Sequence, residues 1–441
     1  MDRYDSYKDS GVKWIGEIPN GWNVTKLKYT KKDSRNSFID GDWIESKDLS
    51  DDGIRYITSG NIGEGKYKEQ GSGYISEDTF NELNCTELFE GELVISRLFL
   101  PVGRSCILPN LNNRVITCVD NVVLRPKDSF NKFYLNYQFN SSRYSEFTEL
   151  ISRGVTLTRI SRGMLGNNSI VVPSLSEQQQ IVSFLDDKTQ KIDSLIQQKE
   201  KKIELLKEKR ISLINHVVTK GLDPNVEMKD SGVEWIGEIP SSWEITKMKY
   251  GVNHLSEKGK PEKKDIKISP ENVESGTGVC FNLYSEHESE GMRFQSGDIL
   301  LNKLRLYLKK ILFTDYDGFS LGEMIVLRTN NKLNNKYFYQ LLFSQGLIDL
   351  LDSQSTGIKL PRVSPDVILN TEIVYPPLNE QQQIVEYLDK QTEEIDTLIQ
   401  LEQKKIDTLK EYRQSLISEV VTGKIRVCEE DNSLSLNSQI V

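Results

Sequence analysis

The chain has 441 residues, enough for about two to four domains, and its 37% hydrophobic content can fill globular cores. Its formal net charge of -9 argues against a protein that coats nucleic acid indiscriminately, although it does not exclude local basic patches. No apolar run approaches the ~18 residues of a membrane span, and the polar start is no signal peptide, so we expect a soluble, cytoplasmic protein. We expect neither a metal site nor a disulfide framework, because the cysteines and histidines are few and scattered: Cys85, Cys106, Cys118, Cys280, Cys428, His216, His254 and His287.

A duplication organises the chain. Residues 8–29 and 229–250 are identical at sixteen of 22 positions, and both contain the motif WIGEIP. A second motif, EQQQIV, begins at Glu177 and again at Glu380, 203 residues later, whereas the WIGEIP motifs lie 221 residues apart. The variable middle of the second copy is therefore 18 residues shorter. Near-identical frames around two divergent inserts indicate one scaffold that presents two different recognition surfaces.

The duplicated motifs divide the chain into seven segments. In chain order we predict a frame at 1–29, an insert at 30–175, a helix at 176–221, a second frame at 222–250, a second insert at 251–378, a second helix at 379–423 and a polar tail at 424–441. The inserts contain short alternating runs, such as 91–97 and 121–125, which are typical of strands between turns. One helix is expected in each insert, at 132–147 and 336–344. Each insert is therefore predicted to be an α+β globule.

Both predicted long helices are amphipathic. Apolar residues recur at spacings of three, four and seven among lysines, glutamates and glutamines, and the second helix repeats the stripe of the first. Ser176 and Asn379 directly precede EQQQ, where a short polar side chain can cap a helix. At 1.5 Å per residue each helix would be about 65 Å long. Such a narrow stripe needs a partner, and two-fold internal symmetry favours an antiparallel coiled coil of the two helices.

The order of the segments also predicts where the ends of the chain lie. The second frame follows directly on the end of the first helix, whereas the first frame has no helix before it. The helix that it lacks is the one that ends near 421–423. We therefore expect the two ends of the chain to lie close together, in a circular organisation, with a loose polar tail beyond Val427.

The two frames and their arrangement resemble a known family. The GVxWIGEIPxxW frame, the EQQQIVxxL frame before a long helix, and their duplication around divergent inserts are similar to the specificity subunit of Type I restriction-modification systems. The resemblance covers essentially the whole chain. It implies two globular α+β target recognition domains, each reading one half of a bipartite, asymmetric double-stranded DNA target, separated by two long antiparallel helices.

The resemblance also implies partners. In that family the specificity subunit is a non-catalytic part of an adenine-specific methyltransferase and restriction complex. We expect two methyltransferase (modification) subunits and restriction/translocase subunits to dock on the chain. S-adenosylmethionine, and ATP with Mg for restriction, would be bound by these partners and not by this chain.

The residues themselves indicate local contact with DNA despite the acidic total. Residues 299–314 contain no acid, and 303–309 alternates as a strand would, with cationic and aromatic side chains on one face. Such a face suits phosphates and base edges, and the alternative is an ordinary solvated strand face. The candidates are Lys303, Arg305, Tyr307 and Lys309, with Arg97 and Arg104 in the corresponding acid-free stretch of the first insert.

A second basic cluster precedes each long helix. Residues 152–166 contain no acid, and the matching stretch of the second copy is also basic. Gly154 and Gly357 occupy matching places, which indicates a tight turn or a close approach of the backbone to a phosphate. The alternative is a surface loop that leads into the helix. The candidate DNA-binding residues here are Arg153, Arg159, Arg162, Lys359 and Arg362.

The repeated frames and helix starts carry aromatic and amide side chains. The tryptophans belong to the part of the chain that does not vary, so we expect them to pack against the helices or a partner subunit instead of stacking on bases. The glutamines open the helices and are expected to bridge helices or contact partners. These scaffold candidates are Trp14, Trp22, Trp235, Trp243, Gln178, Gln179, Gln381 and Gln382.

No motif of catalysis is recognisable. An amino-methyltransferase needs an Asp/Asn-Pro-Pro-aromatic loop, and the nearest segment, 374–378, lacks both the acid and the aromatic residue. Residues 60–66 are rich in glycine but lack the spacing and the Ser or Thr of a phosphate-binding loop. The favoured hypothesis is a non-catalytic DNA-recognition subunit. The competing one is a helical scaffold that clamps two protein partners without touching DNA, which the acidic net charge favours.

Overall fold

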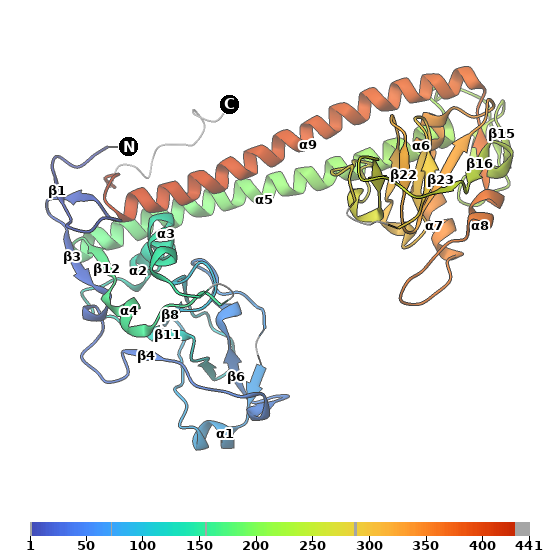
Figure 1. Ribbon diagram of the computed structural model, residues 1–441. Coiled ribbons are helices and arrows are strands. Elements are labelled where there is room, and N and C mark those ends of the chain that lie inside the picture. Colours follow the sequence, from blue (N-terminus) through green and yellow to red (C-terminus); the bar gives the residue numbers. More distant parts are fainter. Residues whose placement is uncertain (1, 72, 155–156, 286–288, 428–441) are drawn as a thin grey trace. The chain divides into compact units, whose positions relative to one another are not determined.

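The computed structural model describes residues 2–71, 73–154, 157–285 and 289–427 (Figure 1). The chain divides into two compact units: residues 1–198 with 405–441 form unit 1, and residues 199–404 form unit 2. Each unit contains one frame, one insert and part of each of two long helices. The predicted loose tail from 428 onward, with Cys428, and also His287 lie outside the described residues. In the part of the chain that is described, no helix is long and apolar enough to cross a lipid bilayer.

The two long helices are α5 (Leu175–Lys220) and α9 (Leu378–Val421). In unit 2 they run antiparallel, because Lys199 of α5 lies 3.0 Å from Glu402 of α9 while Arg210, further along α5, lies 3.1 Å from Asp396. Their apolar stripes supply buried side chains to both units, among them Ile192, Ile196, Ile395, Ile406 and Leu409. The expected antiparallel pairing and the α+β class with two long helices are confirmed.

The start of α5 differs from the sequence-based expectation. The helix begins one residue before Ser176, and the Oγ of Ser174 accepts a hydrogen bond from the backbone N–H of Glu177 at 3.3 Å. Ser174 is therefore the capping residue, and the assignment of the cap to Ser176 was wrong. In the second copy Pro377 precedes α9, so a residue without an N–H group stands where the helix begins.

The first glutamine of each EQQQ motif joins the long helix to its insert. Gln178 and Gln381 are fully buried, and their Oε1 atoms accept hydrogen bonds from the backbone N–H of Asn131 (2.8 Å) and Asn334 (2.7 Å). Those two asparagines cap α2 (Lys132–Phe139) and α6 (Asn335–Leu342) with their own side chains. The same bond occurs in both copies, so it fixes the insert to the long helix in the same way twice.

The insert of unit 1 is a pair of four-stranded sheets with strand orders β4-β11-β8-β9 and β10-β6-β7-β5. Buried residues of both sheets, including Ile57, Val94, Cys106, Val115 and Val123, form the core between them. The strands are β4 Phe38–Asp40, β5 Leu49–Ser50, β6 Ile54–Ile57, β7 Gly73–Ile75, β8 Leu93–Ser96, β9 Ser105–Ile107, β10 Val115–Thr117 and β11 Asn121–Leu124. The helices are α1 Glu77–Glu82, α2 Lys132–Phe139, α3 Ser142–Ile151 and α4 Arg162–Asn167.

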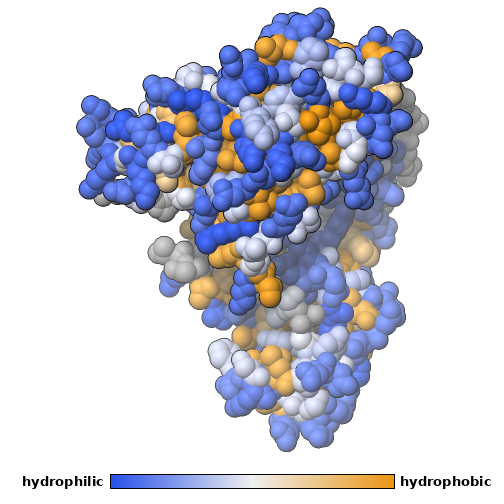
Figure 2. Space-filling model, turned by 90° about the vertical axis from the view of Figure 1, so that its right-hand side faces the viewer, coloured by the Kyte–Doolittle hydropathy of each residue, from blue (hydrophilic) through white to orange (hydrophobic). Residues whose placement is uncertain are grey.

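The insert of unit 2 also has two four-stranded sheets: β16-β23-β20-β21 repeats the order of the first sheet of unit 1, whereas β17-β19-β22-β18 differs from the order of the second. Its strands are β16 Val252–Leu255, β17 Lys258–Gly259, β18 Lys267–Ile268, β19 Gly291–Phe294, β20 Ile299–Asn302, β21 Ile311–Phe313, β22 Gly318–Ser320 and β23 Met324–Thr329. The helices are α6 Asn335–Leu342, α7 Gln345–Ser353 and α8 Pro365–Asn370. Figure 2 views the molecule from the side of unit 2, where hydrophobic residues (orange) form small groups between hydrophilic ones (blue).

Each insert has two consecutive helices where one was predicted. In unit 1 the predicted helix at 132–147 breaks into α2 and α3 at Asn140, and in unit 2 α7 follows α6. The Nδ2 of Asn140 donates to the carbonyl oxygen of Asn136 at 2.6 Å, and the Oγ of Ser141 donates to that of Gln138 at 2.8 Å. These short polar side chains compete with the backbone for hydrogen bonds and end the helix.

The frames close each unit on the end of a long helix. In unit 1 the frame is a hairpin of β1 (Tyr7–Asp9) and β2 (Glu17–Pro19), followed by β3 (Asn23–Lys26), which pairs with β12 (Ser169–Val172). In unit 2 it is a hairpin of β13 (Met228–Asp230) and β14 (Glu238–Pro240), followed by β15 (Glu244–Lys247), which pairs with β24 (Glu372–Tyr375). In unit 1 the Nζ of Lys424 donates to the carbonyl oxygen of Glu17 at 2.5 Å, and the N–H of Arg426 donates to that of Asp2 at 2.9 Å. Within the described residues, which end at 427, the predicted closeness of the two ends of the chain is confirmed.

The buried Glu402 should make stability depend on acid pH. Hydrogen bonds from Lys202 and Lys199 lower the pKa of Glu402 to about 2, from an ordinary value of 4.5. A lowered folded-state pKa contributes stability above pH 4.5 that is lost as pH falls towards 2. We therefore expect Glu402→Gln to destabilise the protein at pH 6 and progressively less below pH 4.5, measured as urea midpoints. Glu204→Gln, which removes an exposed pair with Lys201, is the control and should have little effect at either pH.

Candidate nucleic-acid interface

Two loops that are far apart in the sequence lie side by side in each insert. In unit 1 the loop after β8 bridges to the segment before α4 through Leu98 and Arg159, and the N–H of Phe99 donates to the carbonyl oxygen of Thr158 at 3.0 Å. In unit 2 the equivalent bridge joins Leu304 and Arg362. We call this pair of loops the loop platform: residues 97–104 with 153–154 and 157–162 in unit 1, and residues 303–310 with 356–362 in unit 2. The two segments that carry the basic clusters thus lie side by side in each insert.

The second loop of each platform is a short hairpin. In unit 2 Thr356 and Arg362 exchange two backbone hydrogen bonds, of 2.8 and 2.9 Å, and in unit 1 Arg153 and Arg159 do the same. Gly154 and Gly357 have φ values of +102° and +99°, which favour glycine. A Cβ at Gly154 would also lie 2.5 Å from the carbonyl oxygen of Leu157. The glycines therefore serve the tight turn that the sequence indicated.

Two of the arginines predicted in the first insert are buried. Arg97 is 5% exposed, with its Nη1 donating to the carbonyl oxygen of Ile160 at 3.2 Å and its Nη2 3.0 Å from the carboxylate of Asp40. Arg104 donates to the carbonyl oxygens of Ile62 at 2.6 Å and Ser59 at 2.8 Å. Burial lowers the pKa of both guanidinium groups. The expectation that they face DNA is contradicted: they hold the loop against the sheet.

The other arginines of the first platform reach solvent. Arg153 is exposed, and the side chains of Arg159 and Arg162 are 49% and 45% exposed. Arg159 lies 2.8 Å from the carboxylate of Asp120, and Arg162 lies 3.1 Å from that of Asp40. Each ion pair fixes one side of a guanidinium group and leaves the rest of it accessible to a ligand.

The predicted strand at 303–309 does not exist. β20 ends at Asn302, Arg305 and Lys309 have φ values of 52° and 48°, and residues 306–308 form a single 3-10 turn. The left-handed residues reverse the chain, so the strict alternation of side chains is lost. Lys309 consequently points inward, 8% exposed, and its Nζ donates to the carbonyl oxygen of Phe343 at 3.0 Å. Burial also lowers the pKa of Lys309. Because the strand is absent and the side chain is buried, the prediction that Lys309 lies on a DNA-facing strand was wrong.

The remaining candidates of the second insert lie at the surface. Arg305 and Lys359 are exposed, and the Nη2 of Arg305 donates to the carbonyl oxygen of Lys359 at 3.4 Å. Arg362 and Lys303 share the carboxylate of Glu323, at 2.5 and 3.5 Å. Apolar side chains accompany these cations: Tyr307, Ile358 and Leu360 are all at least half exposed.

Sequence reasoning missed the acids that organise both platforms. Asp120 and Glu323 precede equivalent strands, β11 and β23, and each pairs with the arginine at the end of the hairpin, Arg159 or Arg362. The search for acid-free stretches could not find them, because they lie outside those stretches in sequence. The comparison of the two copies would have found them, since they stand 203 residues apart, the same offset as the EQQQIV motifs.

The tryptophans of the frames pack inside their units. Trp22 and Trp243 are 1% and 0% exposed. Trp14 stacks on Phe147 of α3 with ring centroids 5.5 Å apart, and Trp235 touches Gly346 of α7, where an added Cβ would lie 3.1 Å from it. These tryptophans join the frame to the insert. Gln179 and Gln382 are exposed at the helix surface.

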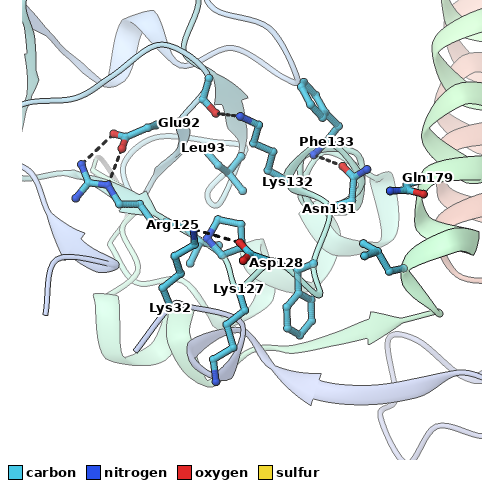
Figure 3. Close-up of a pocket in the computed structure, with 15 residues that line it drawn as sticks. Lys32, Glu92, Leu93, Arg125, Lys127, Asp128, Asn131, Lys132, Phe133 and Gln179 are labelled. Atoms are coloured by element: carbon cyan, nitrogen blue, oxygen red, sulfur yellow. Dashed lines mark hydrogen bonds and ion pairs between the residues drawn. The ribbon is translucent and has the colours of Figure 1, made fainter. Parts of the chain in front are cut away.

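A pocket of about 450 Å³ lies beside the start of α2 in unit 1 (Figure 3). Its cations already have partners: Arg125 lies 2.6 Å from Glu92, and the Nζ of Lys132 donates to the carbonyl oxygen of Gly91 at 2.6 Å. The pocket therefore offers little free charge to an anionic ligand. Among the described residues, no group of three or more His, Cys, Asp or Glu side chains could hold a metal ion.

Comparisons with known proteins agree with this duplicated architecture. Residues 23–205 and 243–411 match the family model described as Type I restriction modification DNA specificity domain. The chain is 24% identical over 440 residues to the putative type I restriction enzyme MjaX specificity subunit of Methanocaldococcus jannaschii, covering 96% of this chain and 98% of that protein. It is 26% identical over 448 residues to the MjaIX specificity subunit of the same organism, covering 94% and 96%.

Solved structures share the fold. A chain from a structure concerning complex assembly and conformational transition of the type I R-M system has a TM-score of 0.69 at 13% identity, covering 92% of this chain and 99% of that one. The HsdS subunit of Thermoanaerobacter tengcongensis has a TM-score of 0.52 at 14% identity, covering 92% and 98%. With two family-model matches spanning both copies, the chain belongs to the family of Type I restriction-modification specificity subunits, which recognise DNA and are not themselves the catalytic subunits.

Proposed function

We propose that each insert reads one half of a bipartite, asymmetric DNA target through its loop platform. Two methyltransferase subunits and the restriction/translocase subunits dock on the chain and carry S-adenosylmethionine, and ATP with Mg. The complex works on DNA in the cytoplasm. The asymmetry follows from the inserts, which share the strand order of one sheet but differ in the other sheet and carry different side chains at equivalent places.

One observation carries this proposal: the same two loops meet in both inserts and expose cations together with apolar side chains. Cations attract phosphates, and an arginine can also pair with the edge of a guanine. In unit 2 the exposed cations are Arg305, Lys359 and Arg362, and in unit 1 they are Arg153, Arg159 and Arg162. The whole chain has a formal net charge of -9, so these exposed cations form local positive surfaces on an acidic protein, at the place where contact with DNA is proposed.

The alternative of a scaffold that never touches DNA makes a different prediction for the same surface. It requires the platforms to contact protein partners, so removing their charge would weaken assembly of the complex. DNA reading requires that assembly persists and that DNA affinity or sequence preference changes. Both quantities can be measured on the reconstituted complex.

Charge-removing changes in one platform should affect one half-site. We expect Arg305→Ala or Lys359→Ala to weaken binding at the half-site of the second insert by about 1–3 kcal/mol if the side chain reads a base edge. The preference at the other half-site should persist. Competition gel shifts with targets mutated in either half measure both effects.

Arg153→Ala provides the mirror experiment in the first insert, and Lys263→Ala, an exposed lysine of the second insert outside its platform, is the control. Equal weakening on all sequences would identify phosphate contacts. No change in DNA binding by any platform variant, with assembly weakened, would refute DNA reading by the platforms.

A further inference from the structure

The apolar stripes of α5 and α9 cannot distinguish one long helix from the other. Residues 203 apart occupy equivalent positions, and along the stripe they are the same residue: Ile192 with Ile395, Ile203 with Ile406, Leu206 with Leu409. Hydrophobic contact is non-directional and depends on the area that is buried. The stripe of α5 would therefore fit a second α5 as well as it fits α9.

The outer ion pairs of the two helices are equally unselective. In unit 1 Arg413 of α9 lies 2.8 Å from Asp193 of α5, and in unit 2 Arg210 of α5 lies 3.1 Å from Asp396 of α9. Arg210 is equivalent to Arg413, and Asp193 to Asp396. Two α5 helices, or two α9 helices, placed antiparallel would bring together an aspartate and an arginine at both places.

Between these pairs, one contact joins two positions that are equivalent to each other. Lys199 of α5 and Glu402 of α9 stand 203 residues apart in the sequence and meet at 3.0 Å. The side chain of Glu402 is 5% exposed, and the Nζ of Lys202 also lies 2.9 Å from its carboxylate. In an antiparallel pair of two α5 helices, Lys199 would meet a second Lys199. In a pair of two α9 helices, Glu402 would meet a second Glu402, but also Lys405, which is equivalent to Lys202, so its charge would be compensated.

We propose that the Lys199–Glu402 pair selects the partner of each long helix: it permits α5 with α9 and excludes α5 with α5, where only lysines would meet. Since the two helices are present in equal numbers, every α9 is then left for an α5. A buried ion pair adds little to stability compared with apolar side chains, whereas an uncompensated buried charge is strongly unfavourable. The pair therefore acts mainly against wrong partners. If the inserts read DNA as proposed above, this selection keeps two different readers in one molecule and so keeps the target asymmetric.

The test uses the whole protein, cut once. A protease site is placed in the exposed loop at 222–225, between α5 and β13, and the folded protein is cleaved so that every residue remains present. The cut protein is unfolded in urea and refolded, and native mass spectrometry counts mixed and like-with-like pairs of the two fragments. We expect the unchanged protein to return almost only mixed pairs.

Neutralising the pair should remove the selection. In K199Q/E402Q the share of like-with-like pairs should rise at least about tenfold, because no like charges then meet. In K199E/E402K the charges are exchanged, and Lys405 occupies the position equivalent to Lys202, so mixed pairs should again dominate. R210Q/R413Q should weaken all pairings alike without changing the distribution. Abundant like-with-like pairs in the unchanged protein, or no increase in K199Q/E402Q, would overturn the proposal.

A second measurement does not depend on cleavage or on refolded fragments. In the uncut chain K199E should lower the urea midpoint of unfolding, because two carboxylates then meet, and K199E/E402K should restore it. A single variant as stable as the original, or a double variant as unstable as the single, would also overturn the proposal.

Discussion

Four residues added to each long helix should widen the unread gap of the proposed bipartite DNA target by about one or two base pairs. Insertion between Gln198 and Lys199 in α5 and between Lys404 and Lys405 in α9 falls where the two compact units meet in the sequence, so the contacts inside each unit are kept. Four helical residues lengthen the helix by about 6 Å and keep the apolar stripe roughly in phase. Because base pairs are spaced about 3.4 Å apart, this added length corresponds to about one or two base pairs. Sequencing of methylated adenines in a host that carries the altered subunit with its partners gives the new target.

The half-site sequences should not change, because neither insert is altered. Four residues inserted at 222–225, in the loop after α5, provide the control, since that loop belongs to neither helix, and they should leave the gap as it was. An unchanged gap after lengthening of both helices would mean that the helices do not set the spacing.

Replacement of Trp243 by alanine should lower the free energy of unfolding by about 3–5 kcal/mol, since a fully buried aromatic side chain is lost. Trp243 packs among residues of α5, α9 and the insert of unit 2, so the loss should be visible there first. Hydrogen exchange of peptides from unit 2, read by mass spectrometry, localises the effect.

The two copies allow a finer test of the same site. The Nε1 of Trp243 donates to the carboxylate of Glu380 at 2.9 Å, whereas the buried Nε1 of the equivalent Trp22 finds no hydrogen-bond partner among the described residues. The equivalent Glu177 accepts instead from the hydroxyl of Tyr4, at 2.6 Å. Trp243→Phe should therefore cost about 1.5–3 kcal/mol more than Trp22→Phe, the contribution of a hydrogen bond to a charged group. Equal losses in urea unfolding would contradict this account.

The cationic side chains of the loop platforms are of two kinds: those held by an ion pair and those exposed at the surface. Arg159 and Arg362 hold their hairpins through Asp120 and Glu323, so they combine a structural contact with a place on the proposed interface. Arg305 and Lys359 are exposed, and the Nη2 of Arg305 donates a hydrogen bond to the carbonyl oxygen of Lys359. The clearest effects on DNA alone are therefore expected from Arg305 and Lys359.

The sequence by itself determined the elements whose signal is local or repeated. The helices at 175–220 and 378–421 were predictable to within two residues at each end, because an apolar stripe of helical period is a property of neighbouring residues. The closeness of the chain ends was predictable as well, because the second copy shows which helix end a frame must meet. The matching places of Gly154 and Gly357 in the two copies indicated a tight turn or a close approach to a phosphate, and the structure shows the tight turn.

Only the tertiary structure decided which cations face solvent. Arg97, Arg104 and Lys309 lie in stretches without acids, yet they are buried, because carbonyl oxygens and a carboxylate from distant segments compensate their charges. The alternation at 303–309 failed for a related reason: the backbone turns left-handed at Arg305 and Lys309, and the N–H of Arg305 donates to the carbonyl oxygen of Pro361 in the hairpin beside it. A periodic sequence pattern is enough to predict a helix, because its hydrogen bonds join residues close together in the sequence. The exposure of a charged side chain depends on hydrogen-bond and ion-pair partners from distant segments, which only folding brings near.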